Sequence, residues 1–215
     1  MKINNMLLML LIILFILLLL KLKSKKNLND NCLIPFDLYP KLNQIIKNKH
    51  IIIQELNNVL YSNRWILYDD LHHKLIFKKN NIDDVFKILK SKETSLSINL
   101  SEKPTWKLYG LLFNRQIYNN DCPNTIKLLL NIPNVINAGF SCLEAGKSTD
   151  YHTDNNDEFY RVQIPLIIPH GNCKFKINNK IIDWSMPFIF DDNCLHQAWN
   201  LTNENRYVLI LDILK

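Results

Sequence analysis

The chain has 215 residues, a formal net charge of +6 and 47% hydrophobic residues, which is enough for one domain with a substantial core. Five of its 26 Lys and Arg residues lie in the first 26 residues, which contain no acid, so the remainder carries 21 basic and 20 acidic residues. The excess positive charge therefore belongs to the N-terminal flank and excludes a nucleic-acid partner as its explanation. The five cysteines include no CxxC pair, which predicts buried free thiols rather than a disulfide framework or a zinc site.

The first predicted element is an apolar segment at residues 6–20, "MLLMLLIILFILLLL", with lysines on both sides. As a helix it reaches roughly 22 Å, short of the roughly 30 Å hydrocarbon core, so the flanking lysines must snorkel for it to span. Paired small residues for signal peptidase are missing at its end, which favours an uncleaved single-pass anchor over a cleaved signal. The lysine excess after the segment places the following domain in the cytoplasm by the positive-inside rule.

After a polar linker that ends at Pro40, apolar residues at helical spacing predict an amphipathic helix at about 40–60 and a second at 82–91. From Trp106 onward, short apolar runs alternate with Pro, Gly and Asn-Asn turns, which is typical of an antiparallel sandwich or barrel. The pair at 178–179 predicts one hairpin turn. The expected division is therefore an anchor with a lysine-rich flank at 1–26, a linker and helical supporting segment at 27–105, and a β-rich core at 106–215.

Polar residues interrupt these apolar runs at strand spacing. Residues two apart on a strand share a face, so His152 and Asp154 point the same way, as do Arg161 and Gln163. Two histidines and one carboxylate on one face of iron(II) leave three positions open for a bidentate co-substrate and dioxygen. The pair His152 and Asp154 can supply two of these ligands, with His196 from a distant strand as the third.

Arg206 follows His196 by ten residues, across a turn that brings it back beside the histidine's strand. A guanidinium held there can bind a dicarboxylate bidentately. Residues 191–192 are expected to organise the turn that presents His196. Trp184 and Trp199 are expected to be core or rim aromatics, with lining of the substrate mouth as the alternative for one of them.

Residues from about 106 to 213 resemble the aspartyl/asparaginyl β-hydroxylase family of iron(II) and 2-oxoglutarate dioxygenases, and the order and spacing of the motifs match that family. The resemblance implies a mainly β fold with flanking helices, a double-stranded β-helix (the jelly-roll or cupin-like barrel), here preceded by one N-terminal transmembrane helix. The resembling stretches are "DCPNT" at 121–125, "FSCLEAGKSTDYHTD" at 140–154, "YRVQIPLIIP" at 160–169, "CKFKI" at 173–177, "FDDNCLHQAWN" at 190–200 and "NRYVLILDI" at 205–213.

The resemblance also implies roles for individual residues. His152 and His196 correspond to iron ligands, and Arg206, helped by Ser141, to the group that binds the distal carboxylate of 2-oxoglutarate. Arg161 reaches the other end of the co-substrate from a neighbouring strand. The implied cofactors are Fe(II), 2-oxoglutarate as co-substrate and O2, with 2-oxoglutarate converted to succinate and carbon dioxide while an unactivated carbon is hydroxylated.

Two residues depart from the family pattern. The animal peptide hydroxylases carry a glycine where this chain has Asp154, which here would complete an ordinary facial triad. The family often has a histidine where this chain has Gln163, so that contact with the co-substrate is altered.

Three functions follow as hypotheses. The first is hydroxylation of the β-carbon of Asp or Asn residues in a peptide or protein, and the alternative is hydroxylation of membrane-lipid acyl chains by a member of the same family. The third, of a different class, is a non-catalytic barrel that only binds a ligand. Animal members of the family lie in the secretory lumen, against the lysine asymmetry, and the sequons at Asn99 and Asn200 would be glycosylated there.

Overall fold

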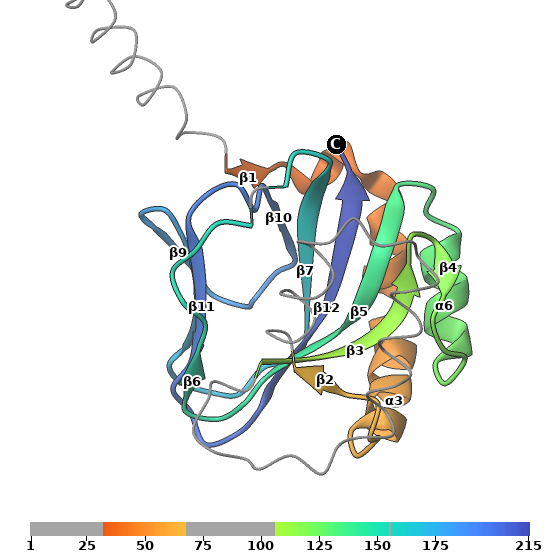
Figure 1. Cartoon of the computed structure of the whole chain (residues 1–215), viewed down its shortest axis with the longest axis horizontal. Coiled ribbons are helices and arrows are strands. Elements are labelled where there is room, and N and C mark those ends of the chain that lie inside the picture. The colour runs from red at the N-terminus through yellow and green to blue at the C-terminus, as the bar shows by residue number, and fades with distance from the viewer. Residues whose placement is uncertain (1–31, 68–105, 155) are drawn as a thin grey trace, which may run out of the picture. The chain divides into compact units, whose positions relative to one another are not determined.

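The computed structural model describes residues 32–67, 106–154 and 156–215 (Figure 1). The chain divides into two units, residues 1–32 and 33–215, and the second is described below. The predicted anchor at 1–26 and the predicted helix at 82–91 both lie outside the described residues. Among the helices of the described ranges, none combines the length and the apolar character needed to cross a bilayer.

Two antiparallel sheets form the domain, as the strand-like runs predicted. The large sheet has the order β1-β10-β7-β12-β5-β3-β2, with β4 paired to β3, and the small sheet has the order β6-β11-β8-β9. Strands β5 to β12 are divided between the sheets as 5-12-7-10 and 6-11-8-9, which is the strand order of a jelly roll. The strands are β1 (Leu33–Ile34), β2 (Ile66–Leu67), β3 (Trp106–Phe113), β4 (Gln116–Ile117), β5 (Val135–Leu143), β6 (Lys147–Ser148), β7 (Phe159–Ile167), β8 (Cys173–Ile177), β9 (Lys180–Ile182), β10 (Phe188–Phe190), β11 (His196–Asn200) and β12 (Arg206–Leu214).

Helices cover one face of the large sheet (Figure 1). The predicted helix at 40–60 is present but broken at Asn48, whose side-chain amide donates to the Gln44 carbonyl at 2.8 Å and ends the first helix. The helices are the 3-10 turns η1 (Phe36–Leu38) and η2 (Pro40–Leu42), and α2 (Asn43–Lys47), α3 (Lys49–Val59) and α6 (Pro123–Leu130).

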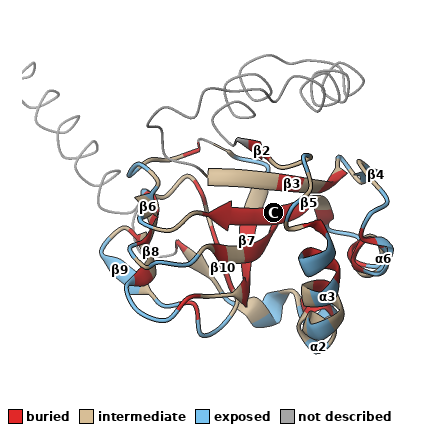
Figure 2. Cartoon of the chain, turned by 90° about the horizontal axis from the view of Figure 1, so that it is seen from below, coloured by how far each residue is buried: buried red, intermediate tan, exposed pale blue. Residues whose placement is uncertain are grey.

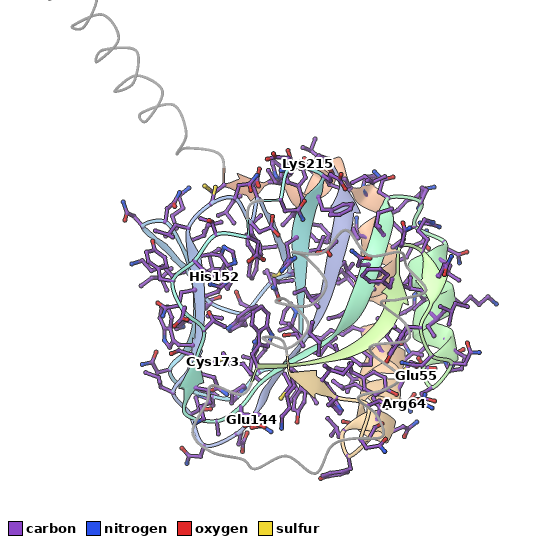
Figure 3. The ribbon with its side chains drawn as sticks, viewed as in Figure 1. Glu55, Arg64, Glu144, His152, Cys173 and Lys215 are labelled. Atoms are coloured by element: carbon purple, nitrogen blue, oxygen red, sulfur yellow. The ribbon has the colours of Figure 1, made fainter. Side chains whose placement is uncertain are left out.

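Glu55 ties α3 to α6, and Figure 3 shows it on the helix side of the domain, away from His152. Its carboxylate is buried and accepts from the backbone N–H groups of Asn124 and Thr125 at 2.9 and 2.8 Å, and from the side chains of both residues. A carboxylate from another helix therefore caps the N-terminus of α6.

The strands of the large sheet have two buried faces with different surroundings (Figure 2). On β12, Leu209, Leu211 and Ile213 belong to the same core cluster as the helix residues Ile52 and Leu56. The alternate residues of β12 point to the opposite face, toward the small sheet. One face of each central strand therefore packs against the helices, and the other is available for a site.

The predicted hairpin turn is confirmed. The turn at 178–179 joins β8 to β9, and Asn178 adopts a positive φ of 47°, a conformation that asparagine tolerates.

The prediction of buried free thiols is correct for three cysteines, Cys122, Cys142 and Cys173. Cys32 and Cys194 are disulfide-bonded, so the prediction is wrong for these two.

Candidate functional site

A cavity that opens to solvent lies between the two sheets. Strands β5, β7, β10 and β12 of the large sheet and β8 and β11 of the small sheet contribute residues to its wall. Six of the seven residues singled out in the sequence line it: Ser141, His152, Arg161, Gln163, His196 and Arg206. The seventh, Asp154, is buried beside it.

His152 and His196 are held together by their backbones. They form an isolated antiparallel bridge, with N–H···O distances of 3.0 Å from His152 to His196 and 2.8 Å in the reverse direction. Their imidazole rings lie with centroids 4.4 Å apart. Residues 44 positions apart in the sequence therefore present two imidazoles to the same point, and Figure 3 shows His152 beside the small sheet.

The second ring nitrogen of each histidine fixes its tautomer. Nδ1 of His152 lies 2.7 Å from the Asp150 carbonyl, and Nδ1 of His196 lies 2.8 Å from the Cys194 carbonyl. Since a carbonyl only accepts, each Nδ1 carries the proton and each Nε2 keeps a lone pair for a metal ion. Burial lowers the pKa of His196 to about 4, although the bond to the Cys194 carbonyl raises it, so this imidazole is neutral at physiological pH.

Asp154 completes a three-ligand group. Its Oδ1 lies 3.4 Å from Nε2 of His152, and one potential ligand atom from each of Asp154, His152 and His196 lies within 4.8 Å of the others. Two imidazole nitrogens and one carboxylate oxygen are the donor set of non-haem Fe(II) sites. The residues present therefore fit an Fe(II) ion.

Arg161 connects Asp154 to two further carboxylates. Its three guanidinium nitrogens meet Oδ2 of Asp154 at 3.0 Å, Oδ2 of Asp192 at 3.2 Å and Oδ1 of Asp212 at 3.0 Å. Burial, together with the neighbouring carboxylates of Asp154 and Asp212, raises the pKa of Asp192 to about 6, although Arg161 lowers it. Three acidic side chains thus share one cation, and a divalent ion bound at the histidines would offset the remaining negative charge.

Arg206 lies on the cavity wall and is only 2% exposed. Its guanidinium lies 4.9 Å from the ring centroid of Trp184. Among the residues that the structure describes, no carboxylate forms an ion pair with it, and its Nε has no hydrogen-bond partner. Burial lowers its pKa to about 10, so it stays cationic at neutral pH. A buried cation without an anion is costly, which indicates a site for an anionic ligand.

Ser141 and Gln163 supply further polar groups to the cavity. The Trp106 indole N–H donates to Ser141 Oγ at 2.7 Å, so the serine hydroxyl keeps its own proton to donate elsewhere. Gln163 is buried, and within the described ranges its Oε1 has no hydrogen-bond partner.

Two residues of this site, Asp192 and Asp212, do not stand among the predicted site residues, since Asp192 is predicted only to organise a turn. Trp184 is buried in the core, as predicted, and its ring lies beside the Arg206 guanidinium. The place of Asp212 on the cavity side could have been found from its spacing of six residues after Arg206 on one strand, since even spacings share a face.

Curated relatives match about half of the chain. An ornithine lipid ester-linked acyl 2-hydroxylase from Rhizobium tropici is 34% identical over 123 residues, covering 54% of this chain and 44% of that protein. The human aspartyl/asparaginyl beta-hydroxylase is 27% identical over 125 residues, covering 54% of this chain and 16% of that protein. The chain thus spans less than half the length of either relative.

Solved structures give more distant likenesses. A 2OG-Fe(II) oxygenase family oxidoreductase from Burkholderia pseudomallei has a TM-score of 0.42 and 8% identity, covering 54% of this chain and 70% of that chain. A viral collagen prolyl hydroxylase from Paramecium bursaria Chlorella virus-1, solved as a 2OG complex, has a TM-score of 0.37 and 11% identity, covering 51% of this chain and 79% of that chain.

The family assignment rests on the sequence match to the family as a whole. The model of the aspartyl/asparaginyl beta-hydroxylase family matches residues 47–215, which include both sheets' main strands and every residue of the candidate site. The chain therefore belongs to the aspartyl/asparaginyl beta-hydroxylase family.

Proposed function

We propose that this chain is an Fe(II)- and 2-oxoglutarate-dependent dioxygenase that hydroxylates an unactivated carbon. The observation that carries the proposal is that two features meet at one cavity. Potential ligand atoms of His152, Asp154 and His196 lie within 4.8 Å of one another, so these side chains can share a metal ion. Beside them, Arg206 is a buried cation that no carboxylate of the described residues pairs with.

In this proposal His152 and His196 bind the ion through Nε2, and Asp154 binds it through a carboxylate oxygen. When bound, Fe(II) with 2-oxoglutarate and O2 supplies the oxidation of an unactivated C–H bond, which no side chain can perform. The Phe175 and Phe190 rings pack against the His196 imidazole, with centroids 5.9 and 5.0 Å from it. This aromatic wall keeps the ring in place and excludes water from its buried side.

The co-substrate binds in the same cavity. Arg206 takes the distal carboxylate of 2-oxoglutarate as a bidentate ion pair, and the Ser141 hydroxyl donates to the same carboxylate. Arg161 and Gln163, which line the same cavity, contact the other end of the co-substrate in this proposal. The distal carboxylate would neutralise the charge of Arg206, which is buried and cationic.

Two substrate classes fit this chemistry. The first is the β-carbon of Asp or Asn residues in a peptide or protein, which is the activity that names the human relative. The second is a lipid acyl chain, which is favoured by the Rhizobium tropici relative, since that protein is 34% identical against 27% for the human one. A non-catalytic barrel that only binds an anionic ligand would account for Arg206, but it gives no reason for the complete His152, Asp154 and His196 group beside it.

Membrane attachment through the N-terminal segment at 1–26 belongs to the proposal as well, together with the division into anchor, supporting segment at 27–105 and catalytic core at 106–215. The side of the membrane needs a glycosylation test, for which the Asn200 sequon is unsuitable. Asn200 is fully buried, and its side-chain amide donates to the carbonyls of Leu143, Glu144 and Glu204. Asn99, outside the described residues, is the sequon to test.

The test is succinate formation from labelled 2-oxoglutarate by the purified full chain with Fe(II), with peptide and lipid substrates added in turn. We expect substrate-stimulated succinate that is lost in His196→Ala. Succinate no higher than in the His196→Ala variant with every candidate substrate would leave the binding-only hypothesis in place. Stimulation by phospholipid or ornithine lipid but not by Asp- or Asn-containing peptides would decide for the lipid substrate.

A further inference from the structure

A row of polar side chains crosses three neighbouring strands of the large sheet on its cavity side. Asn137 on β5 lies directly opposite Asp212 on β12, and Asp212 lies directly opposite Arg161 on β7. The Asn137 amide donates to Asp212 Oδ2 at 2.9 Å, and Arg161 Nε donates to Asp212 Oδ1 at 3.0 Å. Both oxygens of Asp212 are therefore engaged, each by a different neighbouring strand.

The row ends at the carboxylate of the candidate metal site. Because the guanidinium is planar, the bond from Nε to Asp212 sets the direction of its other nitrogens. Arg161 Nη1 then donates to Asp154 Oδ2 at 3.0 Å, while the other oxygen of Asp154 lies 3.4 Å from Nε2 of His152. The arginine side chain is only 8% exposed and that of Asp154 only 2%, so solvent has little part in this arrangement.

The backbone also holds Asp154. Its N–H donates to the Asp192 carbonyl at 2.9 Å, which fixes the position of the residue but not the rotation of its carboxylate. The contact from Arg161 determines which oxygen faces the histidines. Hydrogen-bonded partners of metal ligands act in this way, and their loss weakens metal binding about 10- to 100-fold.

We infer that Asp212 is a positioning residue for the metal centre: through Arg161 it orients Asp154 so that Oδ1 is presented to the ion. The inference rests on the proposed function only in that the His152, Asp154 and His196 group binds a divalent metal. Asp212 contacts neither the ion nor a substrate, and Asn137 anchors the far end of the row. The competing explanation is that the three residues only cross-link the strands.

The experiment is a titration of the metal-free full chain with Co(II), followed by the visible d–d absorption bands, which report both affinity and coordination geometry. The variant is Asp212→Asn, which keeps the size of the side chain and removes its charge. Asp183→Asn is the matched control. It removes the same charge from an exposed residue, whose carboxylate accepts a hydrogen bond from the Ser185 N–H. Thermal melting of each metal-free variant measures its folding.

We expect Asp212→Asn to weaken Co(II) binding about 10- to 100-fold and to alter the d–d spectrum, while Asp183→Asn binds as the wild type does. An Asp212→Asn protein with wild-type affinity and spectrum would overturn the row and leave the proposed function intact. A wild-type chain that does not bind Co(II), or a His196→Ala variant that binds it equally well, would overturn both. Should Asp212→Asn fail to fold, Asn137→Ala takes its place. We expect this variant to bind Co(II) several-fold more weakly than the wild type, and unchanged Co(II) affinity would be the contrary result.

Discussion

The first prediction is that Arg206 contributes to ligand binding and not to the stability of the ligand-free protein. Its guanidinium is 2% exposed and lies over Trp184, and no carboxylate of the described residues pairs with it. Replacement by methionine removes a desolvated charge and keeps an unbranched side chain of similar length against the indole. We therefore expect Arg206→Met to leave the free energy of unfolding unchanged or to raise it.

Binding of 2-oxoglutarate should respond in the opposite direction. A bidentate contact consists of two hydrogen bonds to charged groups, each worth about 1.5–3 kcal/mol. Taking roughly 3–4 kcal/mol for the pair, and about 1.36 kcal/mol for each tenfold change, the affinity of Arg206→Met should fall roughly 100- to 1,000-fold. The loss would appear as a higher KM for 2-oxoglutarate in succinate formation.

The assay compares the wild type, Arg206→Met and Arg64→Met, by urea unfolding without ligand and by the rise in Tm that 2-oxoglutarate with Mn(II) produces. Arg64 is the control because it loses the same charge on the helix side of the domain, where it pairs with Asp121 at 2.8 Å (Figure 3). Undiminished 2-oxoglutarate binding by Arg206→Met would refute the assignment of the anion. A large loss of ligand-free stability would show instead that the cation has a structural partner.

Three further predictions test other parts of the molecule. Trp184→Leu should raise the KM for 2-oxoglutarate about tenfold and change kcat much less, because it removes a buried cation–π contact worth roughly 1–2 kcal/mol. The control is Trp199→Leu, on the outer face of the small sheet, which should change neither constant. Burial raises the pKa of Glu55, but hydrogen bonds from Thr125 and Asn124 outweigh burial and lower this pKa below 4.5. The stabilisation by Glu55 is therefore present above about pH 4.5 and is lost as the pH falls through the lower pKa of the folded state. Glu55→Gln should then cost about 1–3 kcal/mol at pH 7 and less at pH 3 in urea titrations, and an equal loss at both pH values would contradict this. Deletion of residues 1–26 should move the protein from carbonate-washed membranes to the supernatant, and retention in the membranes would contradict the anchor.

The sequence predicted that His152, Asp154 and His196 lie together because two of them are close in the chain and the third is on a predicted strand. Residues 152 and 154 share a strand-like stretch, and the spacing of apolar runs after Trp106 predicted the sheets that bring His196 beside them. The two-residue period of a strand carries this information. It depends on no contact between distant residues beyond the pairing of two strands.

Other features depend on partners far away in the chain. Asp212 bonds to Arg161 across 51 residues, and Glu55 caps α6 across 69 residues, with no local pattern that names either partner. The predicted helix at 40–60 was interrupted because the Asn48 side chain competes for a helix carbonyl. Such competition is decided by local geometry that composition does not reveal.

The alternation of faces on the central strands explains why polar groups can stand on core strands at all. On β7, Val162, Ile164 and Leu166 belong to the helix-side core, while Arg161 and Gln163 face the cavity. The stability that the helices gain from one face is therefore independent of what the other face carries. Substitutions on the cavity face should accordingly change ligand or metal affinity at little cost in stability, except where, as at Asp212, a side chain also joins neighbouring strands. Comparing the Asp212→Asn and Arg206→Met proteins separates these two kinds of cavity residue, since only the first should alter both metal binding and the melting temperature.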